Sequence, residues 1–182
     1  KKAKEMVGLD CGTSTLIVCR EQGEKELEYK TFRDAFYLIK GSSPIASKMI
    51  EKGLVSKKYF KDSDGSFIVV GQDAIEKAVE RHDNVRRPMY RGVLSPREPD
   101  ARRVLKFILR DLLGDPRTPG ETLVYSVPAN PVDFSEEDFN TGYHEDALGN
   151  DLKELGYNPK PLNEAEAVGY AELESTDYTG VL

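Results

Sequence analysis

The chain has 182 residues, of which 38% are hydrophobic and 32% charged, and its net charge is −6. This length suffices for one domain with a buried core, or for one domain that carries a small inserted subdomain. The acidic balance argues against a general nucleic-acid-binding protein, which needs clustered Lys and Arg on an exposed face. We therefore expect a globular protein without a nucleic-acid partner.

The sequence contains no membrane-spanning or targeting pattern. No apolar run approaches the roughly 20 residues that cross a bilayer, and no charged-then-apolar signal opens the chain. Cys11 and Cys19 lie close together and make no metal-ligand spacing with His82 or His144. These patterns predict a cytoplasmic location and reduced, packed thiols.

The first third of the chain predicts antiparallel strands. Short apolar runs at residues 6–10 and 16–20 flank a polar turn, and a third strand is expected within residues 27–31. Together they form a three-stranded meander. Residues 35–39 are compatible with another strand, whereas residues 40–58 show no periodicity that assigns an element.

A hairpin and two helices are predicted next. Residues 59–70 form the hairpin, since Asp, Ser and Gly at 62–65 supply turn chemistry between aromatic and β-branched runs. A short amphipathic helix runs from Gln72 until its pattern fades near His82. After a proline-bearing connector, apolar residues recur at helical spacing over residues 101–112.

The last third predicts strands that alternate with helices. Residues 122–127 form a continuous apolar strand of the kind that is buried on both faces. A helix should follow, opened by a capping box at Ser135 and Asp138. After a very short strand at residues 161–162, Asn163 should cap a helix of small residues. This order predicts an α/β fold with a sheet of mixed direction.

The turn between the first two strands carries the strongest chemical signal. Gly12 permits close backbone approach, and the hydroxyls of Thr13, Ser14 and Thr15 add donors, so the turn can cradle a phosphate. Asp10 at the strand end can hold Mg²⁺ through its waters. An ordinary polar hairpin turn explains the same residues.

Residues 7–15 (VGLDCGTST) resemble the first phosphate motif of the superfamily of actin, DnaK and sugar kinases. Residues 69–74 and 87–94 are similar to consecutive stretches of bacterial actins of the MreB and MamK type. Residues 125–129 resemble the strand that ends in Val-Pro-Ala in those proteins, and residues 162–170 resemble their first connecting motif. The resemblance therefore covers nearly the whole chain, in the same order.

The resemblance implies a ribonuclease H-like fold, with a mixed sheet, helices and a small inserted subdomain. We expect residues 1–31 and 95–182 to form the core, subdomain IA, and residues 32–94 to form the inserted subdomain. The second half of the ATPase, which binds adenosine in the family, would be absent from this chain. The isolated fragment is then expected to be inactive and monomeric.

The resemblance also assigns a catalytic role to Glu164, which in the family orients or activates the water that attacks the terminal phosphate. Ala165 replaces the family's proline, a change that affects the preorganisation of the helix more than its chemistry. A carboxylate favoured at a helix N-terminus by the dipole is the alternative explanation of Glu164. Glu166 is expected to complete the helix cap with Asn163.

The implied function is binding and hydrolysis of ATP with Mg²⁺ to drive self-association into cytoskeletal filaments, in the intact bacterial protein. Indirect association with a membrane is compatible with this expectation. Two alternatives stay open at this point. One is a nonpolymerising relative, such as a DnaK-like chaperone or a sugar-kinase-type ATPase, and the other is a noncatalytic scaffold.

Overall fold

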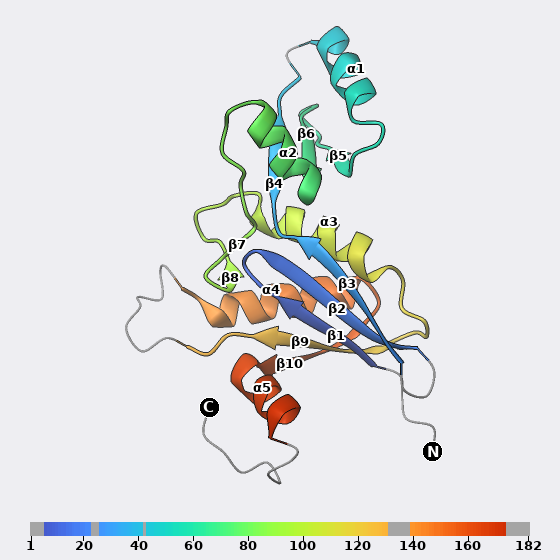
Figure 1. Ribbon diagram of the computed structural model, residues 1–182, viewed down its shortest axis with the longest axis vertical. Helices are drawn as coiled ribbons and strands as arrows, with labels where there is room; N and C mark the ends of the chain where they lie inside the picture. Colours follow the sequence, from blue (N-terminus) through green and yellow to red (C-terminus); the bar gives the residue numbers. More distant parts are fainter. Residues whose placement is uncertain (1–5, 23–25, 42, 131–138, 174–182) are drawn as a thin grey trace.

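The computed structural model describes residues 6–22, 26–41, 43–130 and 139–173. A five-stranded sheet of order β10-β9-β1-β2-β3 lies at its centre (Figure 1). Strands β1, β2 and β3 pair antiparallel, whereas β1, β9 and β10 pair parallel. The predicted meander and the mixed direction of the sheet are confirmed. The strands are β1 (Met6–Cys11), β2 (Thr15–Gln22), β3 (Glu26–Arg33), β9 (Thr122–Val127) and β10 (Asn158–Asn163).

Helices α3 (Ala101–Leu113) and α4 (Thr141–Glu154) cover one face of this sheet. Alternate residues of β1 and β2 point into the core that these helices close, and α3 contributes the apolar stripe that its sequence predicts. Helix α5 (Glu164–Glu172) instead contacts β9 and β10 and supplies no side chain to that core (Figure 1). The described residues therefore leave the opposite sheet face open over β1, β2 and β3.

A second sheet, of order β4-β6-β5, rises from the end of β3 (Figure 1). The predicted hairpin is confirmed as β5 and β6, and the compatible strand as β4. Helix α1 falls in the segment that the sequence leaves unassigned. None of its residues is fully buried, and Ile50 packs only partly against the core of the second sheet. These elements are β4 (Phe36–Ile39), α1 (Pro44–Gly53), β5 (Tyr59–Lys61), β6 (Phe67–Val70) and α2 (Gln72–Glu80).

A short hairpin lies inside the predicted connector. It consists of β7 (Met89–Tyr90) and β8 (Val93–Leu94), joined by Arg91 and Gly92. Both turn residues have positive φ, 52° and 87°, as a type I′ turn requires. The hairpin packs beside the turn that joins β1 and β2, and thereby becomes part of the site described below.

Two details of the last third differ from expectation. Strand β9 alternates, with Leu123, Tyr125 and Val127 buried and the residues between them half-buried, because helices cover only one of its faces fully. Helix α4 begins at Thr141, where the Asn140 side chain accepts a hydrogen bond from Tyr143 N at 2.7 Å. The helix thus starts later than the predicted capping box, whose residues 135 and 138 lie outside the described part of the chain.

Two other sequence predictions concern caps and thiols. Asn163 caps α5, since its Oδ1 accepts from Ala165 N at 2.9 Å. Strand β10 before it is longer than the short strand expected at residues 161–162. Cys11 and Cys19 are free thiols. The proposed limits of the inserted subdomain, residues 32–94, stay a prediction.

Candidate functional site

The turn between β1 and β2 is tight and depends on glycine. A Cβ added to Gly12 would lie 2.8 Å from the carbonyl oxygen of Thr15, a distance that side chains do not tolerate. The turn stands at the carboxyl end of β1, and the parallel neighbour β9 ends at the same edge of the sheet. In open α/β sheets, ligands bind outside the carboxyl ends of the strands.

Asp10 is anchored at this edge by the neighbouring strand. The hydroxyl of Ser126, on β9, donates to Asp10 Oδ1 at 2.8 Å and accepts from Cys11 N at 3.1 Å. Asp10 is exposed and points to the open face of the sheet, whereas Cys11 is buried on the other face. Ser126 therefore fixes the orientation of the carboxylate and leaves its second oxygen accessible.

Glu164 enters the same region from the end of β10, as the first residue of α5. Asp10 and Glu164 line one pocket of about 540 Å³, with Ser126 between their strands. Partial burial, and then the negative charge of Asp10, raise the pKa of Glu164. The structure thus brings together two carboxylates that repel each other, an arrangement that a bound cation relieves.

This carboxylate pair fits a hydrated Mg²⁺ better than a metal held by protein alone. Among the described residues, no group of three or more His, Cys, Asp or Glu side chains is placed to hold a metal. Mg²⁺ commonly takes one or two carboxylates and completes its shell with waters and substrate phosphates. Asp10 can supply such a ligand, directly or through water.

The remaining turn residues accept hydrogen bonds from their surroundings and keep their own donors available. Thr13 Oγ1 accepts from Gly92 N at 2.7 Å, and Thr15 Oγ1 accepts from Arg33 Nη1 at 3.1 Å. The carbonyl of Ser14 accepts from Asp34 N, and the Ser14 side chain is exposed. Because a hydroxyl that accepts can still donate, these residues can reach an anion.

Two buried ionisable side chains support the turn from behind. Asp34 Oδ2 accepts from Met89 N at 3.1 Å, and His144 Nδ1 accepts from Leu94 N at 3.2 Å. Asp34 and His144 therefore bind the first and last residues of the hairpin β7–β8. Its turn residue Gly92 in turn donates a hydrogen bond to Thr13. Within the described residues, Asp34 Oδ1 and His144 Nε2 have no hydrogen-bond partner.

Burial shifts the titration of both side chains. Burial raises the pKa of Asp34 from 3.8 to about 7, against the opposing effects of the Met89 N–H and of Arg87. Burial alone lowers the pKa of His144 from 6.5 to about 4. His144 is therefore neutral at pH 7, and Asp34 is close to its titration midpoint.

Sequence reasoning missed Ser126, Asp34 and His144. Ser126 can be found by aligning the ends of the parallel strands, because it follows the apolar run of β9 at the edge where Asp10 follows that of β1. Asp34 and His144 give no such signal, since an acidic residue between two strands and a histidine on a helix are usually exposed. Of the predicted residues, Asp10 and Glu164 meet in one pocket, whereas Thr15 lines a different one.

The sequence model of the family described as Volactin matches residues 6–181. The chain belongs to the Volactin family. No curated protein matches its sequence.

A solved structure supports the fold independently. It is described as a non-polymerising mutant of MamK bound to AMPPNP, and it is 20% identical to this chain with a TM-score of 0.54. The match covers 93% of this chain and 44% of the MamK chain, so the chain spans less than half the length of that protein. The predicted actin-like fold is confirmed, while the finer assignment to the MreB and MamK type stays a prediction.

Proposed function

We propose that this chain is the N-terminal part of an actin-like ATPase that, when intact, binds ATP with Mg²⁺ and hydrolyses it. The observation that carries the proposal is the meeting of Asp10 and Glu164 in one pocket beside a glycine turn. Asp10 lies near the carboxyl end of β1 and Glu164 directly follows β10, in an actin-like fold. The AMPPNP bound to the MamK structure supports a nucleotide as the ligand.

Each residue of the site has a part in this proposal. The backbone amides of the turn around Gly12 bind phosphate oxygens, and the hydroxyls of Thr13 and Ser14 donate to them. Mg²⁺, when bound, neutralises charge on the phosphates, and Asp10 is the residue that holds it. Glu164 orients the attacking water and accepts its proton, a role that a raised pKa favours at neutral pH.

We further propose that hydrolysis is coupled to self-association into filaments. The actin-like fold and the ordered resemblance of residues 69–74 and 87–94 to bacterial actins support this step. The described residues contain no helix long and apolar enough to cross a membrane. Any membrane association of the filaments would then depend on a partner or on other parts of the protein.

The test is Mg²⁺-dependent phosphate release by the intact protein, with pelleting measured in parallel. Glu164→Ala should reduce the rate on the order of a hundredfold, as expected for loss of a group that positions and deprotonates water. Glu166→Ala is the matched control, since Glu166 lies on the same helix and is also exposed.

Retention of more than about half of the parent rate by Glu164→Ala would refute the catalytic assignment, because general acid–base contributions are far larger. A parent protein that hydrolyses ATP but neither pellets nor forms filaments visible by electron microscopy would refute the filament step alone. Absence of hydrolysis in the parent would favour a noncatalytic scaffold.

A further inference from the structure

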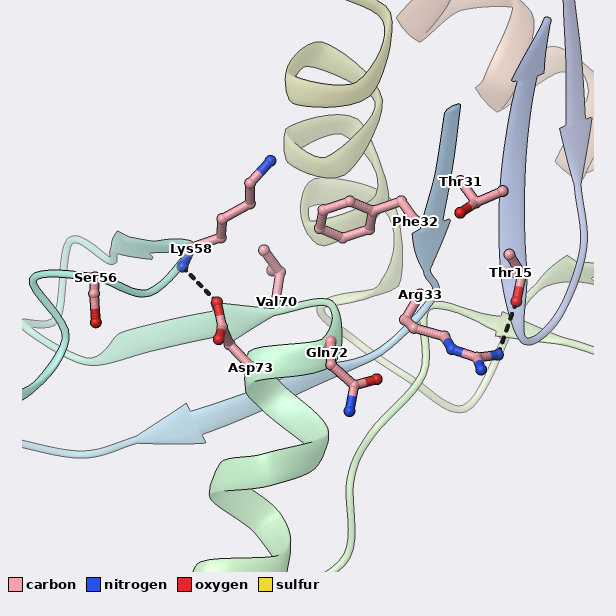
Figure 2. Close-up of a pocket in the computed structure, with 9 residues that line it drawn as sticks. All are labelled: Thr15, Thr31, Phe32, Arg33, Ser56, Lys58, Val70, Gln72 and Asp73. Carbon is pink, nitrogen blue, oxygen red and sulfur yellow. Dashed lines mark hydrogen bonds between the residues drawn. The ribbon is translucent and has the colours of Figure 1, made fainter. Parts of the chain in front are cut away.

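A second pocket opens on the other side of the phosphate turn, between the edge strand β3 and the second sheet (Figure 2). Its volume is about 640 Å³. Figure 2 shows Lys58 on one side and Arg33 on the other, with Phe32 and Gln72 between them. The complete lining is Thr15, Thr31, Phe32, Arg33, Ser56, Lys58, Val70, Gln72 and Asp73.

The positive charge of Arg33 is unbalanced. Among the described residues, Arg33 forms no ion pair, and its hydrogen-bond partner is the neutral hydroxyl of Thr15. Lys58 is different, because its ammonium pairs with Asp111 on α3. Arg110 also forms no ion pair among the described residues, but unlike Arg33 it does not line this pocket.

The carboxylate in the pocket does not offset this charge. Asp73 accepts from Lys58 N at 2.9 Å and pairs with Lys57 Nζ at 2.9 Å. Burial would raise the pKa of Asp73, but the Lys58 amide and Lys57 outweigh it and lower that pKa. Asp73 is therefore ionised and shares the Lys57 ammonium with Glu76, which also lies 2.9 Å from it. Neither carboxylate pairs with Arg33, so among the described residues the guanidinium keeps no counterion of its own.

The rest of the lining suits an oxyanion. The hydroxyls of Thr15, Thr31 and Ser56 and the amide of Gln72 can all donate hydrogen bonds. A guanidinium binds phosphate through two parallel N–H bonds, which makes Arg the preferred side chain for this ligand. The pocket thus combines one unpaired cation with neutral donors.

Arg33 also lies on the same sheet face as the phosphate turn. It is paired with Thr15, and Thr15 alternates with Ile17, which is paired with Asp10. Residues opposite one another, or two apart, share a face of a sheet. Arg33 on β3 therefore lies two strands from Asp10 on β1, on the same face of the sheet.

We propose that this pocket binds a phosphate-type oxyanion, with Arg33 as its principal cationic ligand. The Arg33 guanidinium would donate its hydrogen bonds to the anion instead of to Thr15 Oγ1. The Thr15 hydroxyl, at the end of the phosphate turn, would then lose this donor. The phosphate groups of a nucleotide and a free phosphate both have this chemistry. The proposal does not require hydrolysis or filament formation.

Binding of pyrophosphate to the 182-residue chain in EDTA, followed by calorimetry, tests this proposal without Mg²⁺ or nucleotide. We expect a dissociation constant of about 1 mM or below, which a few charge-assisted hydrogen bonds sustain. Arg33→Gln should weaken binding at least about tenfold. Arg110→Gln is the matched control, because this exposed arginine on α3 is outside the lining, and it should change binding less than about twofold.

A second pair of variants leaves Arg33 in place. Thr31→Glu puts a carboxylate on the strand next to Arg33 and should abolish binding, whereas Thr31→Gln has nearly the same shape and should retain it. Undetectable binding by the parent chain would overturn the proposal. Equal losses in Arg33→Gln and Arg110→Gln would also overturn it, because a general charge effect would then explain the binding.

Asp10→Asn distinguishes the two sources of the anion. If pyrophosphate bridges from Arg33 to the phosphate turn, removing the Asp10 charge should strengthen binding several-fold, because the repulsion between this carboxylate and the anion is lost. This result assigns the pocket to the phosphates of a nucleotide. Unchanged affinity, with the Arg33 dependence intact, assigns it to a free phosphate held by the pocket alone.

Discussion

The two ends of the five-stranded sheet differ in whether their charged side chains are buried and paired or exposed and unpaired. At the end where β1 and β9 begin, Arg20 forms a buried ion pair with Glu121 at 3.0 Å. Arg20 also donates to the carbonyl of Leu113 and to the hydroxyl of Tyr157. At the carboxyl end, Asp10, Glu164 and Arg33 form no ion pair among the described residues and are exposed to solvent.

This difference separates charges that build the fold from charges available to a ligand. A buried ion must be paired and hydrogen-bonded, because its desolvation otherwise costs several kcal/mol. An exposed ion keeps its hydration and needs no partner, so its position is free to serve binding. The comparison predicts that substitutions at the first end change stability, whereas substitutions at the second change ligand binding.

The largest effect is expected at the end of the sheet where β1 and β9 begin, which we call the closed end. Glu121→Ala should lower the free energy of unfolding by roughly 3–5 kcal/mol, because Arg20 would stay buried without its counterion. Urea unfolding followed by circular dichroism measures this change. The double variant Arg20→Met, Glu121→Leu should recover most of the loss, since it removes both charges. A loss below about 1 kcal/mol in Glu121→Ala would show that the pair is not structural.

The second prediction concerns Asp34, the buried acid behind the phosphate turn. Its pKa is raised from 3.8 to about 7, so the folded state holds a proton that the unfolded state has released. The stability that Asp34 contributes is therefore full below about pH 4 and is lost as the pH rises to about 7. The total is roughly 4 kcal/mol at most.

His144 acts with the opposite sign. Its pKa is lowered from 6.5 to about 4, so its contribution is full above about pH 6.5 and is lost as the pH falls. The two trends largely cancel in the parent chain. In Asp34→Asn only the His144 trend remains, so the free energy of unfolding should rise by roughly 3 kcal/mol as the pH increases from about 4 to about 6.5. In His144→Asn only the Asp34 trend remains, so the free energy of unfolding should fall over the same pH range. Parallel stability curves for the three proteins would contradict this assignment.

The smallest effect is expected at the carboxyl end of β1 and β9, which carries Asp10, Glu164 and Arg33 and which we call the open end. Glu164→Gln and Arg33→Gln should each change the free energy of unfolding by less than about 0.5 kcal/mol, as is usual for exposed side chains. The same urea experiment measures both. A loss above about 2 kcal/mol in either variant would place that residue among the structural charges and would remove the contrast between the two ends.

Much of the fold follows from local sequence patterns. The meander, the hairpin β5–β6 and the amphipathic helix α3 were predicted because their apolar periodicity and turn residues are strong. Helix α1 is not predictable in this way, because none of its residues is fully buried and Ile50 packs only partly against the core of the second sheet. The start of α4 at Thr141 was missed because a nearby Ser and Asp offered an equally plausible cap.

The sequence predicts those site residues that lie together in one short segment. The turn at residues 10–15 and Glu164 are each visible in a short stretch, and the resemblance to actin-like proteins joins them. Ser126 and Arg33 become site residues only through strand register, which brings them to Asp10 and Thr15 from distant parts of the chain. Asp34 and His144 depend on burial, which their residue types do not indicate.

The most direct test of the account is hydrogen exchange on the intact protein with and without Mg²⁺ and AMPPNP. We predict slower exchange at the amides of residues 12–15 and 164–166, at the carboxyl ends of the strands. Exchange around Arg20 and residues 113–121, at the other end, should be unchanged. Protection confined to the closed end, or none at residues 12–15, would contradict the assignment of the open end as the nucleotide site.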